Sequence, residues 1–139
     1  KFHPSGSLGN KLKTAGDLML IKKKIPLVNE NQTMKEALRI INLKGLGFIV
    51  VINNHGFTKG IFTDGDLKRL MQKKNKIDKS KIKFYMTKNP FCVEENMLAS
   101  DVLSQMNKRK ITNVCVYNKK NKNITIGVLH IHDLLDNLR

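Results

Sequence analysis

Apolar residues recur with helical spacing in two stretches of this chain, and the two stretches match. Both follow the i, i+3, i+4, i+7 pattern that places side chains on one face of an amphipathic helix. The two sets are Met34, Ala37, Leu38 and Ile41, and, 65 residues later, Ala99, Val102, Leu103 and Met106. Thr33 and Glu36 have capping-box spacing before the first helix, and Asn96 is a candidate cap before the second. The pattern predicts two equivalent helices and therefore an internal repeat.

A buried strand is predicted after each helix, because β-branched and other apolar residues run together at 48–52 and 114–117. A polar turn separates each strand from a second one, which starts at Gly60 in the first copy and at Gly127 in the second. A closing helix follows, so each copy is a predicted strand, helix, strand, strand, helix unit. A unit of roughly 60 residues buries only about 60% of its unfolded surface. We therefore expect the two units to pack sheet against sheet about a pseudo-two-fold axis.

These elements place the chain in the α/β (α+β) class and divide it into four parts. Residues 1–13 contain Gly, Ser and Pro without periodicity and are expected to be the end of a preceding domain and a linker. The first copy spans 14–74, the lysine-rich stretch 75–83 is the connector, and the second copy spans 84–139. Because the chain begins with Lys1 and not with Met, we expect it to be a fragment of a longer protein.

The formal net charge of +15 is a feature that nucleic-acid-binding proteins share. Of the 26 cationic residues, however, 22 are Lys and four are Arg, whereas base and phosphate recognition favours Arg. The lysines are scattered, Asn is also abundant, and no Trp is present to form a stacking platform. A drift of surface positions toward Lys and Asn, as an A/T-rich coding sequence would produce, explains the charge without a partner. No nucleic-acid partner is expected.

No apolar run approaches the roughly 18 residues of a membrane-spanning helix, and no signal peptide is recognisable. We therefore expect a soluble, cytoplasmic protein without a membrane partner. Cys92 and Cys115 are isolated thiols in apolar surroundings, as is typical of buried small hydrophobic residues. The sequence leaves a disulfide between them open.

The stretch 60–67, Gly-Ile-Phe-Thr-Asp-Gly-Asp-Leu, runs from a strand into a helix whose first turn carries Thr63 and Asp66. A helix start offers unpaired backbone N–H groups and a positive dipole end to a phosphate, and Thr63 adds a hydroxyl. Asp66 can accept two hydrogen bonds from a ribose diol. The same residues also fit a structural role in which Thr63 caps the helix and Asp66 completes a capping box. Asp64 would repel a phosphate at this point, which favours a ligand with few charges there.

The twofold pattern, with the Gly60-Ile-Phe-Thr63-x-x-Asp66 motif closing the first copy, resembles a pair of CBS domains, the regulatory unit called a Bateman module. The resemblance covers about residues 14–139. It implies that Thr63 and Asp66 hold the phosphate and the ribose of a bound nucleotide. In the second copy Asp133 matches the family's Asp, but His130 replaces the hydroxyl residue. We therefore expect the second cleft to depart from ordinary adenine-nucleotide binding.

A narrower resemblance rests on three stretches: 2–9 (Phe-His-Pro-Ser-Gly-Ser-Leu-Gly), 60–67, and 127–135 (Gly-Val-Leu-His-Ile-His-Asp-Leu-Leu). They are similar to the D-arabinose 5-phosphate isomerase family, in which a sugar-isomerase (SIS) domain precedes the CBS pair. That family interconverts ribulose 5-phosphate and arabinose 5-phosphate for Kdo and lipopolysaccharide biosynthesis. His3 occupies the position of a family active-site histidine. The rest of that domain is missing from the sequence, so we expect this chain to have no enzymatic activity of its own.

The resemblance implies two ligand-binding clefts. The residues expected to line the first are Ile25, Pro26, Val28, Gly47, Phe48, Thr63 and Asp66. The residues expected to line the second are Val93, Arg109, Ile111, Thr112, Asn113, His130, His132 and Asp133. Two imidazoles and a carboxylate in the second cleft are also ligands that zinc or nickel accepts. No fourth ligand lies nearby in the sequence, and no metal is expected.

This interpretation requires no cofactor. The preferred ligand is CMP-Kdo, whose phosphate and carboxylate suit His130 and Arg109 as hydrogen-bond donors, and AMP or ATP is the second choice. We expect the ligand to regulate the attached isomerase domain allosterically, and we expect the chain to form a dimer or tetramer with copies of itself. The alternatives are an adenine-nucleotide-binding CBS pair from another host protein and a CBS oligomerisation scaffold without ligand.

Overall fold

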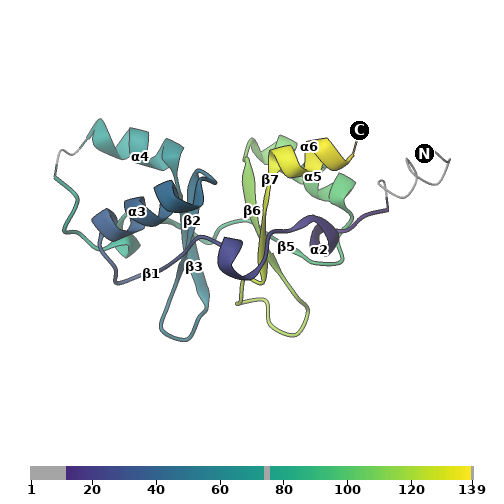
Figure 1. Cartoon of the computed structure of the whole chain (residues 1–139), viewed down its shortest axis with the longest axis horizontal. Coiled ribbons are helices and arrows are strands. Elements are labelled where there is room, and N and C mark those ends of the chain that lie inside the picture. The colour runs from purple at the N-terminus through teal and green to yellow at the C-terminus, as the bar shows by residue number, and fades with distance from the viewer. Residues whose placement is uncertain (1–11, 74–75, 139) are drawn as a thin grey trace. The chain divides into compact units, whose positions relative to one another are not determined.

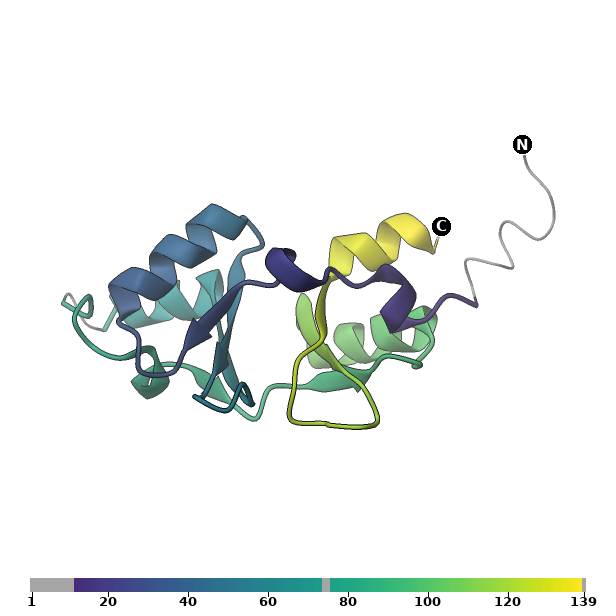
Figure 2. The same ribbon diagram turned by 60° about the horizontal axis from the view of Figure 1, so that its bottom comes forward.

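The computed structural model describes residues 12–73 and 76–138, and the chain divides into two compact units. Among the described residues, the first unit comprises 23–73 and 76–90, and the second comprises 12–22 and 91–138. In Figures 1 and 2 the first unit is blue to teal, and the second is green to yellow with a purple N-terminal segment. His3 lies outside the described residues, as do residues 1–11 of the stretch 1–13 that is predicted to end a preceding domain.

The first unit contains a sheet with the strand order β1-β2-β3-β4. β1 is parallel to β2, whereas β3 is antiparallel to both β2 and β4. The strands are β1 (Leu27–Asn29), β2 (Phe48–Ile52), β3 (Thr58–Thr63) and β4 (Thr87–Lys88). The helices are α3 (Met34–Lys44) and α4 (Asp64–Met71), with the short 3-10 helices η1 (Lys22–Lys24) before β1 and η2 (Ile82–Phe84) before β4.

The second unit repeats this arrangement with the strand order β5-β6-β7. β5 is parallel to β6, and β7 is antiparallel to β6. The strands are β5 (Cys92–Glu94), β6 (Asn113–Tyr117) and β7 (Gly127–His130), and the helices are α2 (Ala15–Leu18), α5 (Ala99–Arg109) and α6 (Ile131–Asn137). The predicted order of strand, helix, strand, strand and helix is confirmed in both copies.

The ends of the two equivalent helices are built differently. α3 starts with the predicted capping box, in which the Thr33 hydroxyl accepts from the Glu36 N–H at 3.2 Å. α5 follows Leu98, which makes no side-chain cap hydrogen bond. The prediction that Asn96 caps α5 is wrong, because Asn96 lies two residues too early and its side chain donates to Glu94 instead. The second helix therefore depends more on packing than on its cap.

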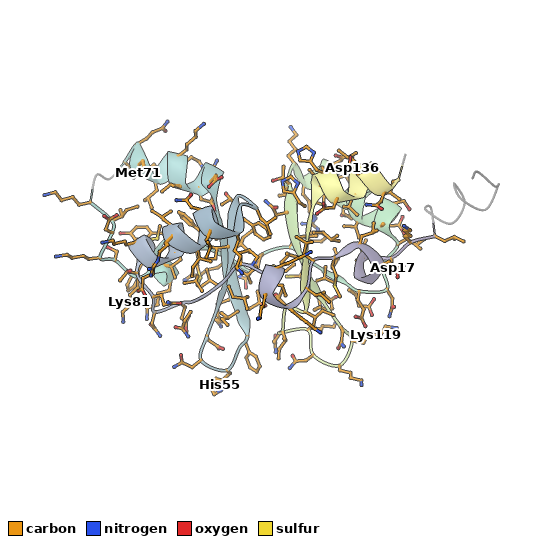
Figure 3. The ribbon with its side chains drawn as sticks, viewed as in Figure 1. Asp17, His55, Met71, Lys81, Lys119 and Asp136 are labelled. Carbon is orange, nitrogen blue, oxygen red and sulfur yellow. The ribbon has the colours of Figure 1, made fainter. Side chains whose placement is uncertain are left out.

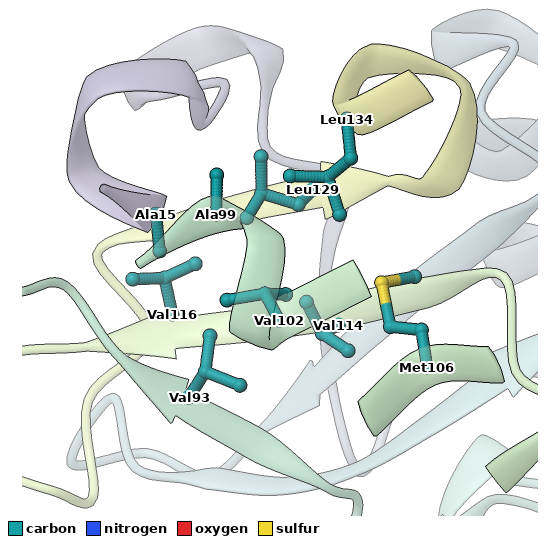
Figure 4. Packing of buried hydrophobic residues seen from close by; sticks show 9 residues of the cluster. All are labelled: Ala15, Val93, Ala99, Val102, Met106, Val114, Val116, Leu129 and Leu134. Carbon is teal, nitrogen blue, oxygen red and sulfur yellow. The ribbon is translucent and has the colours of Figure 1, made fainter. Parts of the chain in front are cut away.

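The predicted apolar helix faces form the cores of the two units. Met34, Ala37 and Ile41 of α3 are buried against β2 and β3, and Leu38 packs at the edge of that cluster. Figure 4 shows the corresponding cluster of the second unit: Ala15, Val93, Ala99, Val102, Met106, Val114, Val116, Leu129 and Leu134. Because both faces are buried as the spacing predicted, the helical pattern identified the core of each copy.

The segment before each repeat packs in a different unit from the repeat that follows it. Leu20 and Val128 exchange two backbone hydrogen bonds of 2.9 and 3.0 Å, which fastens the 12–22 segment to β7 in the second unit. The segment 76–88 belongs to the first unit, where Ile77 and Ile82 are buried in its core. The boundaries of the compact units therefore differ from those of the sequence repeats. The reason is that each of these segments packs against the edge of the other copy's sheet.

Two glycines make this packing possible. Gly60 of β3 lies beneath Met86, and an added Cβ would be 2.8 Å from the Met86 sulfur and 2.6 Å from the Thr87 carbonyl oxygen. Gly127 of β7 lies in the same way beneath Met19. Met19 and Met86 occupy matched positions ahead of the two repeats, as Gly60 and Gly127 do within them. A side chain at either glycine would push the neighbouring segment off its sheet.

A search of the described part of the chain for a helix both long enough and apolar enough to span a bilayer finds no candidate.

We predict that Met34→Ala lowers the free energy of unfolding by about 2–5 kcal/mol, because it removes a fully buried side chain and leaves a cavity. Leu43→Ala on the same helix is the control, since Leu43 is 78% exposed, and its cost should be below about 0.5 kcal/mol. Urea unfolding followed by circular dichroism measures both. Equal losses from the two variants would contradict the assignment of the α3 core face.

A second pair of variants tests the glycine contact. Gly60→Ala should destabilise the protein by about 1–3 kcal/mol, because the Thr87 backbone must move to admit the methyl group. Gly65→Ala, in the first turn of α4, meets its nearest atoms at 3.5 Å and should stabilise by up to about 1 kcal/mol. Urea titrations of the two variants should therefore shift in opposite directions. A neutral Gly60→Ala would show that β4 does not depend on this close approach.

Candidate functional sites

The first candidate site is centred on the start of α4. Thr63 and Asp66 form a complete capping box, in which the Thr63 hydroxyl accepts from the Asp66 N–H at 3.1 Å and an Asp66 carboxylate oxygen accepts from the Thr63 N–H at 3.0 Å. The structural role that the sequence allowed for these residues is therefore present. In the capping box the Thr63 hydroxyl acts only as an acceptor, so it can still donate a hydrogen bond to a ligand.

The other carboxylate oxygen of Asp66 is also engaged. It accepts from an Arg69 guanidinium nitrogen at 2.6 Å, one helical turn later. The Arg69 side chain is 69% exposed and that of Asp66 is 19% exposed, so this ion pair is worth about 0–1 kcal/mol. A ribose diol at Asp66 would have to displace Arg69, at a small cost. Sequence reasoning missed Arg69, although its i, i+3 spacing from Asp66 was a usable signal.

Gly47 and Phe48 lie beside this helix start. Phe48 and Thr63 are paired in the β2–β3 register, and the Asp64 N–H donates to the Gly47 carbonyl at 2.9 Å. Gly47 has a φ of 75°, and a Cβ there would be 3.3 Å from an Asp64 carboxylate oxygen. Gly47, Phe48, Thr63 and Asp66 are thus brought together at one end of β2 and β3. The exposed Asp64 carboxylate stands in the same place, as the sequence predicted.

The remaining residues assigned to the first cleft, Ile25, Pro26 and Val28, are buried. Ile25 and Val28 are 8% and 2% exposed, and Val28 is part of the first unit's core. Pro26 is buried, and its carbonyl accepts from the Val50 N–H at 2.7 Å. Any contribution of these three to ligand binding would come from the backbone.

A hollow of about 230 Å³ lies next to Asp66 and includes neighbours that the sequence did not indicate. Its lining consists of Phe62, Asp66, Arg69, Leu70, Lys73 and Tyr85. Tyr85 directly follows η2 and packs against the core of the first unit, to which Phe62 of β3 belongs. No local sequence pattern connects Tyr85 with Asp66, so this part of the surroundings could not be found from the sequence.

The second candidate site has a histidine at the equivalent helix start. His130 is the N-cap of α6, and its Nδ1 accepts from the His132 N–H at 3.1 Å. The two imidazole rings stack with centroids 4.7 Å apart and an angle of 25° between their planes. Because Nδ1 accepts this bond, the neutral ring carries its proton on Nε2, where it can donate to a ligand. His130 therefore does what Thr63 does in the first unit, capping a helix and offering one donor.

The pKa of His130 is lowered from 6.5, first by burial and then by the neighbouring His132, while Asp133 acts in the opposite direction. Burial and a nearby imidazolium both disfavour the charged form of the ring. His130 is therefore a neutral hydrogen-bond donor at neutral pH. It takes up a second proton only below the pH at which an ordinary histidine does so.

Thr112 and Asn113 lie directly beside His130. Asn113 is paired with His130 in the β6–β7 register, and its side-chain amide donates to the Thr112 hydroxyl at 3.1 Å. Asn113 is 7% exposed, and its side-chain oxygen has no hydrogen-bond partner within the part of the chain that the structure describes. At the equivalent position the first copy has the apolar Phe48. Thr112 likewise matches Gly47, so the two candidate sites differ in polarity at two matched positions.

The other residues assigned to the second cleft contact different parts of the second unit. Val93 is in the core, and Ile111 packs against it. The Arg109 guanidinium lies 3.8 Å from the centroid of the Phe91 ring, a cation–π contact that the sequence did not predict. The Asp133 backbone carbonyl accepts from the Asn137 side chain at 2.7 Å. Thr112, Asn113, His130, His132 and Asp133 form the cluster, and Arg109 is engaged with Phe91.

The described residues contain no group of three or more His, Cys, Asp or Glu side chains arranged to hold a metal ion. The prediction of two isolated thiols needs a correction, because Cys92 and Cys115 are partners in the parallel β5–β6 register. A hydrogen bond between the thiols lowers the pKa of Cys92. The same bond, together with complete burial, raises the pKa of Cys115 well above its ordinary value. Sequence spacing of 23 residues gave no sign of this pairing.

We predict that His130 makes the protein less stable in weak acid. Its folded pKa lies below 6.5, so the unfolded chain binds a proton first as the pH falls, and the stability that His130 contributes above about pH 6.5 is lost below it. His130→Thr, which installs the first copy's cap residue, should fall less in melting temperature between about pH 7.5 and pH 5. Differential scanning fluorimetry measures both proteins. Parallel pH profiles would contradict the inferred burial of this imidazole.

The family model for the CBS domain matches this chain twice, over residues 15–73 and 81–139. Among curated relatives, an uncharacterized protein of Rickettsia prowazekii is 36% identical over 134 residues, and the arabinose 5-phosphate isomerase KdsD of Salmonella typhi is 39% identical over 134 residues. Each alignment covers 96% of this chain and 40% of the relative. The chain thus spans 40% of the length of the curated relatives it matches.

Solved structures with the same fold include a complex of CBSX2 with AMP and the CBS domain pair of protein MJ0100 with 5'-methylthioadenosine and S-adenosyl-L-methionine. The CBSX2 structure has a TM-score of 0.73 at 20% identity and covers 89% of this chain and 94% of its own. The MJ0100 structure has a TM-score of 0.77 at 21% identity and covers 90% of this chain and 94% of its own. The two family matches together span most of the sequence, and the chain belongs to the CBS domain family, of which it carries a tandem pair.

Proposed function

We propose that this CBS pair is the ligand-sensing regulatory module of a D-arabinose 5-phosphate isomerase, binding a nucleotide or nucleotide-sugar in the two candidate sites. The observation that carries the proposal is the convergence of Gly47, Phe48, Thr63 and Asp66 at the start of α4, where the family's nucleotide-binding Thr and Asp are expected. The isomerase relatives support the choice of host protein. The complexes of CBSX2 and MJ0100 support an adenine-containing ligand as one option.

In the first site, the Thr63 hydroxyl donates to a phosphate, and Asp66 accepts from a ribose diol after Arg69 swings away. Arg69 is well exposed and one turn from Asp66, so the released guanidinium is able to pair with the phosphate of the same ligand. The Asp64 carboxylate disfavours a polyphosphate at this point. Among adenine nucleotides, AMP is therefore preferred over ATP in this site.

In the second site, the donors suit a ligand that carries a carboxylate as well as a phosphate. His130 donates from Nε2, Thr112 has a hydroxyl, and Arg109 lies on the same unit. The unpartnered oxygen of Asn113 favours a ligand with an N–H or O–H donor. CMP-Kdo offers all of these groups and is our preferred ligand. Its recognition would make the module a sensor of the product of lipopolysaccharide precursor synthesis.

Regulation follows from differential binding. A ligand that favours one conformation of the CBS pair over another shifts the activity of an attached SIS isomerase domain by no more than that difference in affinity. In this proposal residues 1–13, including His3, connect that domain to the copies at 14–74 and 84–139, with 75–83 between them. The module works in the cytoplasm, without a metal or a required cofactor, as part of a homodimer or homotetramer. Nucleic acid is not its partner.

One observation favours a second function. Both carboxylate oxygens of Asp66 are already hydrogen-bonded, to Thr63 and to Arg69, which is the arrangement expected if the motif serves only to hold the helix. On this alternative the CBS pair is an oligomerisation scaffold whose sites stay empty.

A thermal melt against CMP-Kdo, CMP, AMP and ATP distinguishes the two. A ligand at a hundred times its dissociation constant should add about 2.7 kcal/mol of stability, a rise of several degrees. Because Asp66→Ala also removes the capping box, each variant is compared with its own ligand-free melt. Asp66→Ala should abolish the AMP shift, and His130→Ala the CMP-Kdo shift. Lys119→Gln, on an exposed turn of the second unit (Figure 3), is the control that should keep both shifts.

The absence of any shift with all four ligands would reject the sensing function and leave the scaffold. A shift with AMP or ATP alone, through Asp66, would replace product sensing by sensing of the adenine-nucleotide pool.

A further inference from the structure

A second hollow, separate from both candidate sites, lies at the other end of the first unit's strands. It encloses about 340 Å³, within the range of small-molecule pockets. It is lined by three lysines, Lys59, Lys83 and Lys88, together with Glu30, Phe84, Met86 and Asn89. None of these residues was assigned to a site by the sequence, and none of them lines the hollow beside Asp66. We call it the lysine groove.

The groove is built by the packing of the 76–88 segment on the sheet. The Lys83 N–H donates to the Glu30 carbonyl at 3.1 Å, which fixes this part of the segment beside the residue that follows β1. Gly60 then admits Met86 and pairs with Lys88, so that Lys88 lies on the strand next to Lys59. The three lysines come from two segments far apart in sequence and share one wall only because of these contacts.

The groove is positively charged, because three lysines line it and Glu30 is the one carboxylate in its lining. Residues 23–90 carry 15 of the chain's 26 cationic side chains and five of its 11 carboxylates, a net charge of +10 out of +15. Within the described ranges no ion pair joins a carboxylate to Lys59, Lys83 or Lys88. Three unneutralised ammonium groups around one hollow attract a multiply charged anion.

The remaining lining indicates what is attached to that anion. Phe84 is 70% exposed, and the Lys83 ammonium lies 5.5 Å from its ring centroid. An exposed aromatic face packs against the carbon skeleton of a ligand. The Glu30 carboxylate and the Asn89 amide accept hydrogen bonds from hydroxyl groups, and Glu30 would repel an anion at its own end of the groove.

From this arrangement we propose that the lysine groove binds a phosphate monoester of a small sugar or polyol. The phosphate lies among Lys59, Lys83 and Lys88, the carbon skeleton lies on Phe84, and the hydroxyl groups donate to Glu30 and Asn89. This site goes beyond the proposed nucleotide-sensing function and does not depend on it, because it shares no residue with either candidate site.

Isothermal titration calorimetry of the whole chain with ribose 5-phosphate tests the proposal, at an ionic strength of about 0.15 M so that general charge attraction is screened. Ribose and inorganic phosphate are the comparison probes. We expect ribose 5-phosphate to bind at least about tenfold more tightly than either, since each makes only part of the contacts. Amide NMR shifts of Lys59, Lys83 and Lys88 should move during the titration, while those of Thr63 and His130 should not.

The variant Lys83→Gln with Lys88→Gln should weaken binding by at least about tenfold. The matched control is Lys119→Gln with Lys120→Gln, which removes the same charge from an exposed turn of the second unit and should leave the affinity unchanged. Equal losses in both variants, or binding of inorganic phosphate as tight as that of ribose 5-phosphate, would overturn the proposal. Tighter binding of an aspartate-rich peptide than of ribose 5-phosphate at the groove would also overturn it.

Discussion

The close approach of a methionine to a glycine is the contact on which both units depend. Gly60 receives Met86, and Gly127 receives Met19, with no room for a side chain at either glycine. Through these contacts each sheet takes up the segment that precedes the other repeat. In the first unit the contact fixes β4, seats Ile82 in the core and creates the lysine groove. The absence of a side chain at these two glycines thus decides where the segments 12–22 and 76–88 lie.

The equivalent helix starts of the two copies are capped by different side chains. Thr63 and His130 each cap the following helix, one with a hydroxyl and one with an imidazole nitrogen. Next to them, Phe48 in the first copy is replaced by Asn113 in the second. The capping geometry is kept because the backbone N–H groups of any helix start need acceptors. The side chains around the cap are free to differ, so the two helix starts offer different hydrogen-bonding groups.

A motif that stabilises a helix and a motif that binds a ligand are hard to separate at this position. Asp66 completes the capping box and also pairs with Arg69, so its carboxylate has a structural use before any ligand arrives. Because the ion pair is exposed and weak, the cost of recruiting Asp66 for binding is small. A role in helix capping and a role in ligand binding are therefore compatible for this motif.

The sequence alone determined the repeat, the helix faces and the strands, because these depend on short-range periodicity. The burial of Met34, Ala37, Val102 and Met106 followed from i, i+3, i+4 spacing, and the capping boxes of α3 and α4 from four adjacent residues. Capping-box spacing also connected Thr63 with Asp66, and the sequence assigned Asn113 and His130 to one cleft, whereas their pairing across β6 and β7 came from the structure.

Only the tertiary structure decided which segment joins which sheet, that Cys92 faces Cys115, and that Tyr85 lies by Asp66. It also buried the side chains of Ile25 and Val28, and it brought Lys83 and Lys88 to the same hollow as Lys59. These outcomes rest on contacts between residues far apart in the chain. Such contacts are selected by close packing at positions like Gly60, whose effect no local pattern of polarity records.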